Sequence, residues 1–156
     1  MDFTIPQSLK TEHEELHAEL RKATKEMGQV GAAARSVAAV LHPHFLKEEE
    51  YALPPLGLLS SLAEGRVSTD MGTVLEMTNR LKNDLGQMLE EHKAIVAQLE
   101  VLTDAAKEAR KYAYVRFAEK LVLHAQMEEE VLYPAAILIG EYLRLRKDGE
   151  ASSPAS

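Results

Sequence analysis

Apolar residues recur at intervals of three and four positions over most of this chain, the spacing that places side chains on one face of an α-helix. Four long segments carry the pattern. The composition agrees with it, because Ala, Leu, Glu and Lys are abundant whereas aromatic residues make up only 5%. We therefore predict an all-α protein built from four helices.

The first predicted helix covers about residues 5–29 and ends at Gly28 and Gly31. The second stops at Pro54 and Pro55, because proline lacks the backbone N–H that a continuing helix needs. The residues expected to face inward are Leu9, His13, Leu16, Leu20 and Met27 in the first helix, and Val37, Val40, Leu41, His44, Glu48 and Tyr51 in the second.

The third predicted helix begins at a Ser68 or Thr69 cap and runs to about Thr103, and the fourth runs from about residue 104 to Leu145. Their inner faces are expected to hold Val74, Thr78, Leu81, Leu85, Met88, His92, Ile95, Leu99 and Leu102 in the third helix, and Phe117, Leu121, His124, Glu128, Val131, Leu132, Ala135 and Leu138 in the fourth.

Short links between the helices predict an antiparallel up-down-up-down four-helix bundle. The alternative, two helical hairpins that dimerise, needs a linker that residues 55–68 do not obviously supply. We expect a single domain over residues 1–147 and a flexible tail over residues 148–156, because the chain ends in small and polar residues.

An internal repeat lies inside this pattern: HFLKEEEYALP at residues 44–54 matches HAQMEEEVLYP at residues 124–134. Each copy places a Glu four residues after its His, and each is preceded by another His about thirty residues upstream. The resulting set of candidate metal ligands is His13, His44, Glu48, His92, His124 and Glu128.

All six of these side chains fall where the helical period demands core residues, and burying them without partners would cost roughly 1–3 kcal/mol each. A His and a Glu four residues apart share one helix face, so each copy offers a nitrogen and a carboxylate to one point. Four imidazoles and two bridging carboxylates suit two divalent first-row ions, with an oxo or hydroxo group between them and room for a small ligand. The alternative for the same residues is an ion-pair network in the core.

Neighbouring polar residues are assigned less direct roles. His17, one turn after His13, is either a third nitrogen at one metal, a hydrogen-bonding neighbour or a solvent-facing residue. Glu49 and Glu129 are alternative ligands, although solvent exposure is the default for both. The same two interpretations apply to Glu12 and Glu91, and solvent is the assignment for His42. Tyr51 and Tyr133 fall near the site by helical spacing, where a phenol gates access or donates a hydrogen bond to a bound oxygen species, but packing at the edge of the core is the favoured interpretation.

Charge and composition exclude several classes of function. The 25 acidic residues outnumber 18 Lys plus Arg and no basic cluster is present, so neither nucleic acid nor a membrane surface is an expected partner. The absence of Cys excludes disulfides and thiolate-bound metals. With no signal peptide and no membrane-spanning run, we expect a cytoplasmic protein, monomeric or weakly homo-oligomeric.

In His13, His44-x-x-x-Glu48, His92 and His124-x-x-x-Glu128, over about residues 5–145, the chain resembles the hemerythrin-like, His-His-Glu cation-binding domains. The resemblance implies a four-helix bundle with a carboxylate-bridged non-heme di-iron centre that binds dioxygen or another small ligand. Oxygen-carrying hemerythrins have a second His four residues after the third-helix ligand, where this chain has Val96, and their last carboxylate is an Asp five residues after the His.

These departures make the chain more similar to members of the family associated with sensing, iron handling or repair of nitrosative damage. We accordingly predict a di-iron protein, with manganese as the other candidate metal, that binds dioxygen, peroxide or nitric oxide in oxygen, redox or iron sensing or handling. The alternatives are an enzyme with the same ligands, such as a peroxidase, a catalase or a nitric oxide reductase, and a regulatory module whose folding depends on iron.

Overall fold

The computed structural model describes residues 4–68 and 71–153 of the chain, and within these ranges the protein is helical and contains no strand. The long helices follow the order that the sequence pattern predicts, but two of them are interrupted by a π-helical turn. The elements are α1 (Gln7–Thr24), α2 (Gly28–Lys47), the π turn η1 (Glu48–Ala52), the 3-10 turn η2 (Pro54–Leu58), α3 (Leu59–Ala63), α4 (Gly72–Glu108), α5 (Tyr112–Met127), the π turn η4 (Glu128–Leu132) and α6 (Tyr133–Ala151).

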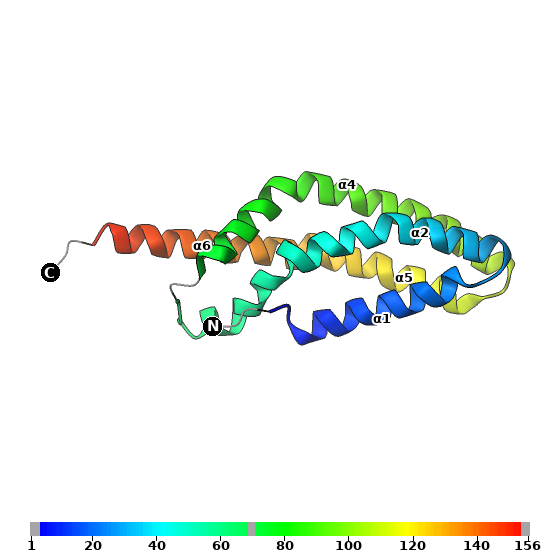
Figure 1. Ribbon diagram of the computed structural model, residues 1–156, viewed down its shortest axis with the longest axis horizontal. Helices are drawn as coiled ribbons and strands as arrows, with labels where there is room; N and C mark the ends of the chain where they lie inside the picture. Colours follow the sequence, from blue (N-terminus) through cyan, green and yellow to red (C-terminus); the bar gives the residue numbers. More distant parts are fainter. Residues whose placement is uncertain (1–3, 69–70, 154–156) are drawn as a thin grey trace.

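The long helices form a bundle in which α2 packs against α1 and α4, and α4 packs against α5 and α6. Figure 1 shows the turn from α1 to α2 and the turn from α4 to α5 together at one end of the bundle. The segment that leads into α4 lies toward the opposite end, where α6 extends beyond the other helices. None of the helices described is long and apolar enough to cross a membrane.

The boundary between the first two helices differs from the prediction. Helix α1 ends at Thr24 and α2 already begins at Gly28, so that Gly31 lies inside α2. Gly28 has a φ of 74°, a conformation that glycine adopts without the steric cost of a Cβ, and it therefore serves the turn itself. Met27, predicted to face inward, lies in this turn and is 92% exposed.

The predicted break between the third and fourth helices is also wrong. Helix α4 continues to Glu108 and α5 starts at Tyr112, so the turn lies several residues after Thr103. Arg110 takes the left-handed conformation there, with a φ of 57°. Glycine or asparagine usually marks such a position, and an arginine gives no sequence signal for it.

The start of α4 and the end of α6 differ from expectation as well. Of the two residues predicted to cap the third helix, Thr69 lies outside the described residues, and the hydroxyl of Ser68 has no hydrogen-bond partner among them. Helix α4 begins without a side-chain cap. At the other end of the chain, α6 continues to Ala151 rather than ending near Leu145.

The inner face of the last helix shifts at the π turn η4. A 3.6-residue period predicts Val131 and Leu138 inside, but these residues are 55% and 67% exposed. Because a π turn closes from residue i to residue i+5, it inserts one residue and moves the buried positions along by one. Tyr133, Ala136 and Ile139 are buried after the turn.

Two apolar clusters fill the bundle, and the predicted metal ligands lie between them along the helices. On α4, for example, His92 lies between Met88 of one cluster and Ile95 of the other. The polar site therefore crosses the middle of the core and has apolar packing on both sides. The first cluster includes Leu16, Leu41, Phe45, Ile95 and Leu121, and the second includes Tyr51, Met88, Tyr133 and Ile139.

Candidate metal centre

The six predicted ligands lie together in one buried cluster, contributed by α1, by α2 with η1, by α4, and by α5 with η4. None of the six is more than 3% exposed. They form two groups that share both glutamates, and within each group the ligand atoms all lie within 4.8 Å of one another. We name the groups position A (His13, Glu48, His124 and Glu128) and position B (His44, Glu48, His92 and Glu128).

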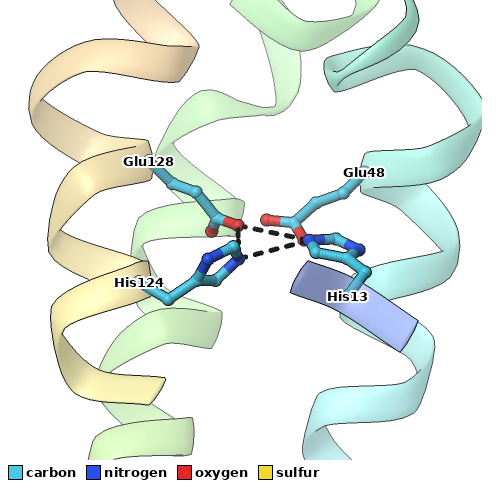
Figure 2. Close-up of side chains that lie close together, drawn as sticks. All are labelled: His13, Glu48, His124 and Glu128. Carbon is cyan, nitrogen blue, oxygen red and sulfur yellow. Dashed lines mark hydrogen bonds and ion pairs between the residues drawn. The ribbon is translucent and has the colours of Figure 1, made fainter. Parts of the chain in front are cut away.

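Each position takes its histidines from different copies of the repeat. At position A, His13 Nε2 lies 3.2 Å from His124 Nε2, and Figure 2 shows these two rings, on different helices, converging with Glu48 and Glu128. At position B, His92 Nε2 lies 2.9 Å from His44 Nε2. The crossed pairing arises because α1 contacts α5 in the bundle, and α2 contacts α4.

Each glutamate directs one oxygen to each position. Glu48 Oε1 lies 2.9 Å from His44 Nε2 at position B, and Glu48 Oε2 lies 3.5 Å from His13 Nε2 at position A. Glu128 behaves in the same way, with Oε2 lying 3.0 Å from His92 Nε2 and Oε1 facing position A. The two carboxylates are thus arranged to bridge the positions.

The donor set fits cations at these positions. The two carboxylate oxygens that face position A, Glu48 Oε2 and Glu128 Oε1, are buried and accept no hydrogen bond among the described residues, although each lies beside an imidazole Nε2, of His13 and of His124 respectively. A buried carboxylate oxygen without a partner is costly unless a proton or a cation compensates its charge. The buried cluster of nitrogen and oxygen donors can therefore hold a metal ion.

A further glutamate faces the outer nitrogen, Nδ1, of every ligand histidine. Because an ionised carboxylate only accepts hydrogen bonds, it favours the proton on Nδ1 and leaves the lone pair of Nε2 directed into the cluster. Glu12, Glu129 and Glu49 therefore orient imidazoles through hydrogen bonds, rather than facing solvent alone as predicted. The contact of Glu91 with His44 is not a hydrogen bond, and His44 Nδ1 has no hydrogen-bond partner among the described residues. The distances from Nδ1 to the carboxylate are 2.7 Å for His124 and Glu12, 2.8 Å for His92 and Glu129, 3.4 Å for His13 and Glu49, and 3.5 Å for His44 and Glu91.

The acid and base groups of the cluster have perturbed pKa values. Burial, together with the charge of Glu128, raises the pKa of Glu48 to about 7. Burial also opposes ionisation of Glu128, but the imidazoles around this carboxylate outweigh burial and hold its pKa well below the usual range. Burial disfavours the charged imidazole of His124, yet the contact with Glu128 prevails and raises the pKa of His124 to about 9. Protons and cations therefore compete for the same buried negative charge.

Tyr133 lies within the site, although packing was the favoured prediction and a role beside the site the alternative. Its side chain is fully buried, and its hydroxyl donates a hydrogen bond to Glu48. Burial and the nearby charges of Glu48 and Glu128 raise its pKa, so the phenol keeps its proton among these carboxylates. A π turn brings residue i+5 back to the face of residue i, and Tyr133 follows Glu128 by five positions. By contrast, the Tyr51 hydroxyl donates a hydrogen bond to Asp84, 2.9 Å away.

His17 does not join either group of ligands. Its ring is half-buried and lies edge-on to Phe45 at 4.9 Å between centroids, and Phe45 in turn stacks on His13 at 4.1 Å. Burial lowers the pKa of His17, which is therefore neutral at pH 7. His42 is exposed, as predicted.

Two cavities reach the histidines from the surface. The larger has a volume of about 780 Å³ and is lined by His13, His17 and Glu49, among other residues. The smaller, about 340 Å³, is lined by His92 and Val96, at the position where oxygen-carrying hemerythrins have a further histidine. Both have room for a diatomic ligand, and both lead to a histidine of the cluster.

A comparison with protein families gives a match to the hemerythrin HHE cation binding domain over residues 83–151. The matched part contains His92, His124 and Glu128, whereas His13, His44 and Glu48 come from the part before it. No curated protein and no solved structure shows a significant match to the chain. The resemblance inferred from the His-x-x-x-Glu repeat is confirmed by residues 83–151, which match the family of hemerythrin HHE cation binding domains.

Proposed function

We propose that this protein is a non-heme di-iron protein that binds dioxygen, or a related small ligand such as peroxide or nitric oxide, within an antiparallel four-helix bundle. One observation carries the proposal. Two buried positions with two histidines each share the same two glutamates, and each glutamate directs one oxygen to each position. That arrangement suits two first-row ions held close together.

The donor types favour iron, with manganese as the other candidate. Imidazole nitrogen and carboxylate oxygen suit both metals, and no thiolate is present to favour a softer ion. In this proposal His13 and His124 hold one ion, His44 and His92 hold the other, and Glu48 with Glu128 bridge them. When bound, the two ions would supply an open coordination position and the electrons for chemistry with a small oxidant.

The remaining residues prepare the site for a small ligand. The outer glutamates Glu12, Glu49 and Glu129 fix three of the four imidazole rings, which lowers the reorganisation needed on metal binding. The apolar clusters on both sides keep bulk water from the buried carboxylates. The cavity lined by His13 and Glu49 provides a route to position A.

Metal analysis combined with spectroscopy tests the proposal. Protein produced with added iron is expected to bind two ions per chain, and exposing the reduced protein to air should produce a new visible absorption band that disappears again on removing oxygen. Binding of fewer than one ion per chain after iron loading would refute the metal site. Two bound ions without any spectral response to oxygen, peroxide or nitric oxide would refute ligand binding.

A second candidate is an enzyme that turns over peroxide or nitric oxide at the same site. The polar wall of the larger cavity favours it, because His17 is neutral at pH 7 and lines this cavity together with His13, where its imidazole can accept a proton. The two candidates differ in one measurement. Catalytic consumption of peroxide, reduced roughly tenfold or more by His17→Ala with both ions retained, would identify the enzyme.

A further inference from the structure

The hydroxyl oxygen of Tyr133 lies close to all four ligands of position B. It is 3.3 Å from His44 Nε2, 3.2 Å from His92 Nε2 and 3.2 Å from Glu128 Oε2, and it donates its hydrogen bond to Glu48 Oε1. The other two tyrosine hydroxyls with hydrogen bonds in the described residues, those of Tyr51 and Tyr114, donate to carboxylates outside the cluster.

One hydrogen bond does not account for this placement. A phenol has a single proton to donate, whereas Tyr133 has two imidazole nitrogens and two carboxylate oxygens around it. Ligand atoms that surround one first-row ion at about 2.1 Å lie roughly 3 Å from one another. The oxygen of Tyr133 keeps that spacing to His44, His92 and Glu128.

We propose that Tyr133 is a fifth protein ligand at position B, binding the ion there through its phenol oxygen. This inference rests on the proposed dinuclear site and adds a ligand that the His-x-x-x-Glu motif does not contain. Binding to a ferric ion breaks the O–H bond of the phenol and releases one proton to solvent, with no change of oxidation state.

The two positions are then unequal. In the repeat, Tyr133 corresponds to Leu53, which is buried but has no polar atom in its side chain. Position A consequently has no equivalent of Tyr133, and the larger cavity reaches its His13. With one coordination place at position B taken by the chain, an added small ligand binds at position A.

Visible spectroscopy of the ferric protein tests the inference. A phenolate bound to Fe(III) gives a charge-transfer band, and resonance Raman excitation in that band shows the ring vibrations of a coordinated tyrosine. The wild-type protein loaded with Fe(III) is expected to show both. Tyr133→Phe should lose both while still binding two ions per chain, whereas Tyr51→Phe, which removes another buried tyrosine's hydroxyl, should keep them.

The outcomes separate this inference from the proposed function. Two bound ions, with no tyrosine vibrations in the wild-type spectrum, would overturn the ligand role and leave the dinuclear site standing. The same would follow if the Tyr133→Phe spectrum matched the wild type. Failure of the wild-type protein to bind metal would overturn both. Because the Raman measurement uses the wild-type chain, it decides the question even if Tyr133→Phe does not fold.

Discussion

Positions A and B have the same types of ligand but different surroundings. Each has two histidines and a share of both glutamates, and each has one short and one longer contact from Nδ1 to an outer carboxylate. At position B, the Tyr133 hydroxyl lies close to His92, and Val96 lines a cavity together with His92. Around position A, Phe45 stacks on His13 and the larger cavity opens.

The repeat, with the histidine upstream of each copy, contains the candidate metal ligands of the site but does not determine which residues surround them. The residues proposed to hold metal recur in both copies, because both halves of a dinuclear site would need the same donors. The residue proposed to close one position to added ligands is not repeated, because Tyr133 corresponds to Leu53 in the other copy. Small-ligand chemistry at this site is therefore expected to be asymmetric although its ligand set is nearly symmetric.

The largest effect is expected from removing a bridge, since each glutamate serves both positions. Glu48→Ala or Glu128→Ala should reduce bound iron from two ions to at most one per chain, measured by metal analysis of purified protein. Glu50→Ala is the matched control, because Glu50 belongs to the same motif but is exposed and paired with Arg80. Retention of both ions by the bridge variants would contradict the shared-carboxylate arrangement.

The pH dependence of stability should have opposite signs with and without metal. In chelator-treated protein, the raised pKa of His124, from 6.5 to about 9, stabilises the fold below pH 6.5, and this contribution is lost as pH rises through 9. The raised pKa of Glu48 acts in the same direction between pH 4.5 and about 7. The apparent melting temperature without metal should therefore fall between pH 6.5 and 9.

With iron bound, the melting temperature should rise over the same interval, because metal binding releases protons from the histidines. Thermal melts of both forms across this interval measure the difference. His124→Gln should flatten the metal-free profile, by up to about 3 kcal/mol of unfolding free energy for a shift of this size. Parallel profiles for the two forms would show that protons and metal do not compete.

Replacing an outer glutamate should weaken metal binding more, the shorter the distance between its carboxylate and the Nδ1 of the histidine. Glu12→Gln, at 2.7 Å from His124, is expected to weaken metal binding roughly 10–100-fold. Glu49→Gln, at 3.4 Å from His13, should have a smaller effect on the same position. Competition titrations with a chelator measure both, with the exposed Glu15→Gln as a control. Equal losses for all three variants would rule out orientation by hydrogen bonding.

The smallest effect on metal content is expected at His17. His17→Ala should keep two ions per chain with affinity changed less than about twofold, because this histidine is in neither ligand group and packs on Phe45 rather than binding at position A. Metal analysis and chelator titration measure this. Loss of one ion would instead indicate that His17 is a ligand of position A. The chain would then have as many histidine ligands as the oxygen-carrying hemerythrins.

The sequence predicted the helices wherever the 3.6-residue period is uninterrupted. The inner face of α4 agrees with the prediction from Val74 to Leu102. Prediction failed where the backbone departs from that period without a compositional signal, as at Arg110 in a left-handed turn and at Val131 in a π turn. The choice between these local geometries depends on packing against other helices, and the sequence of one segment does not specify that packing.

The sequence by itself determined the six residues that gather in the site, because only paired burial explains polar side chains at so many core positions of a helical pattern. Only the tertiary structure decided which of these residues lie together at position A and which at position B. Contacts between helices pair His13 with His124 and His44 with His92, across the two copies of the repeat. It also decided that Tyr133 enters the cluster, because the π turn that precedes it moves that side chain from the predicted edge into the core, where it is hydrogen-bonded to Glu48.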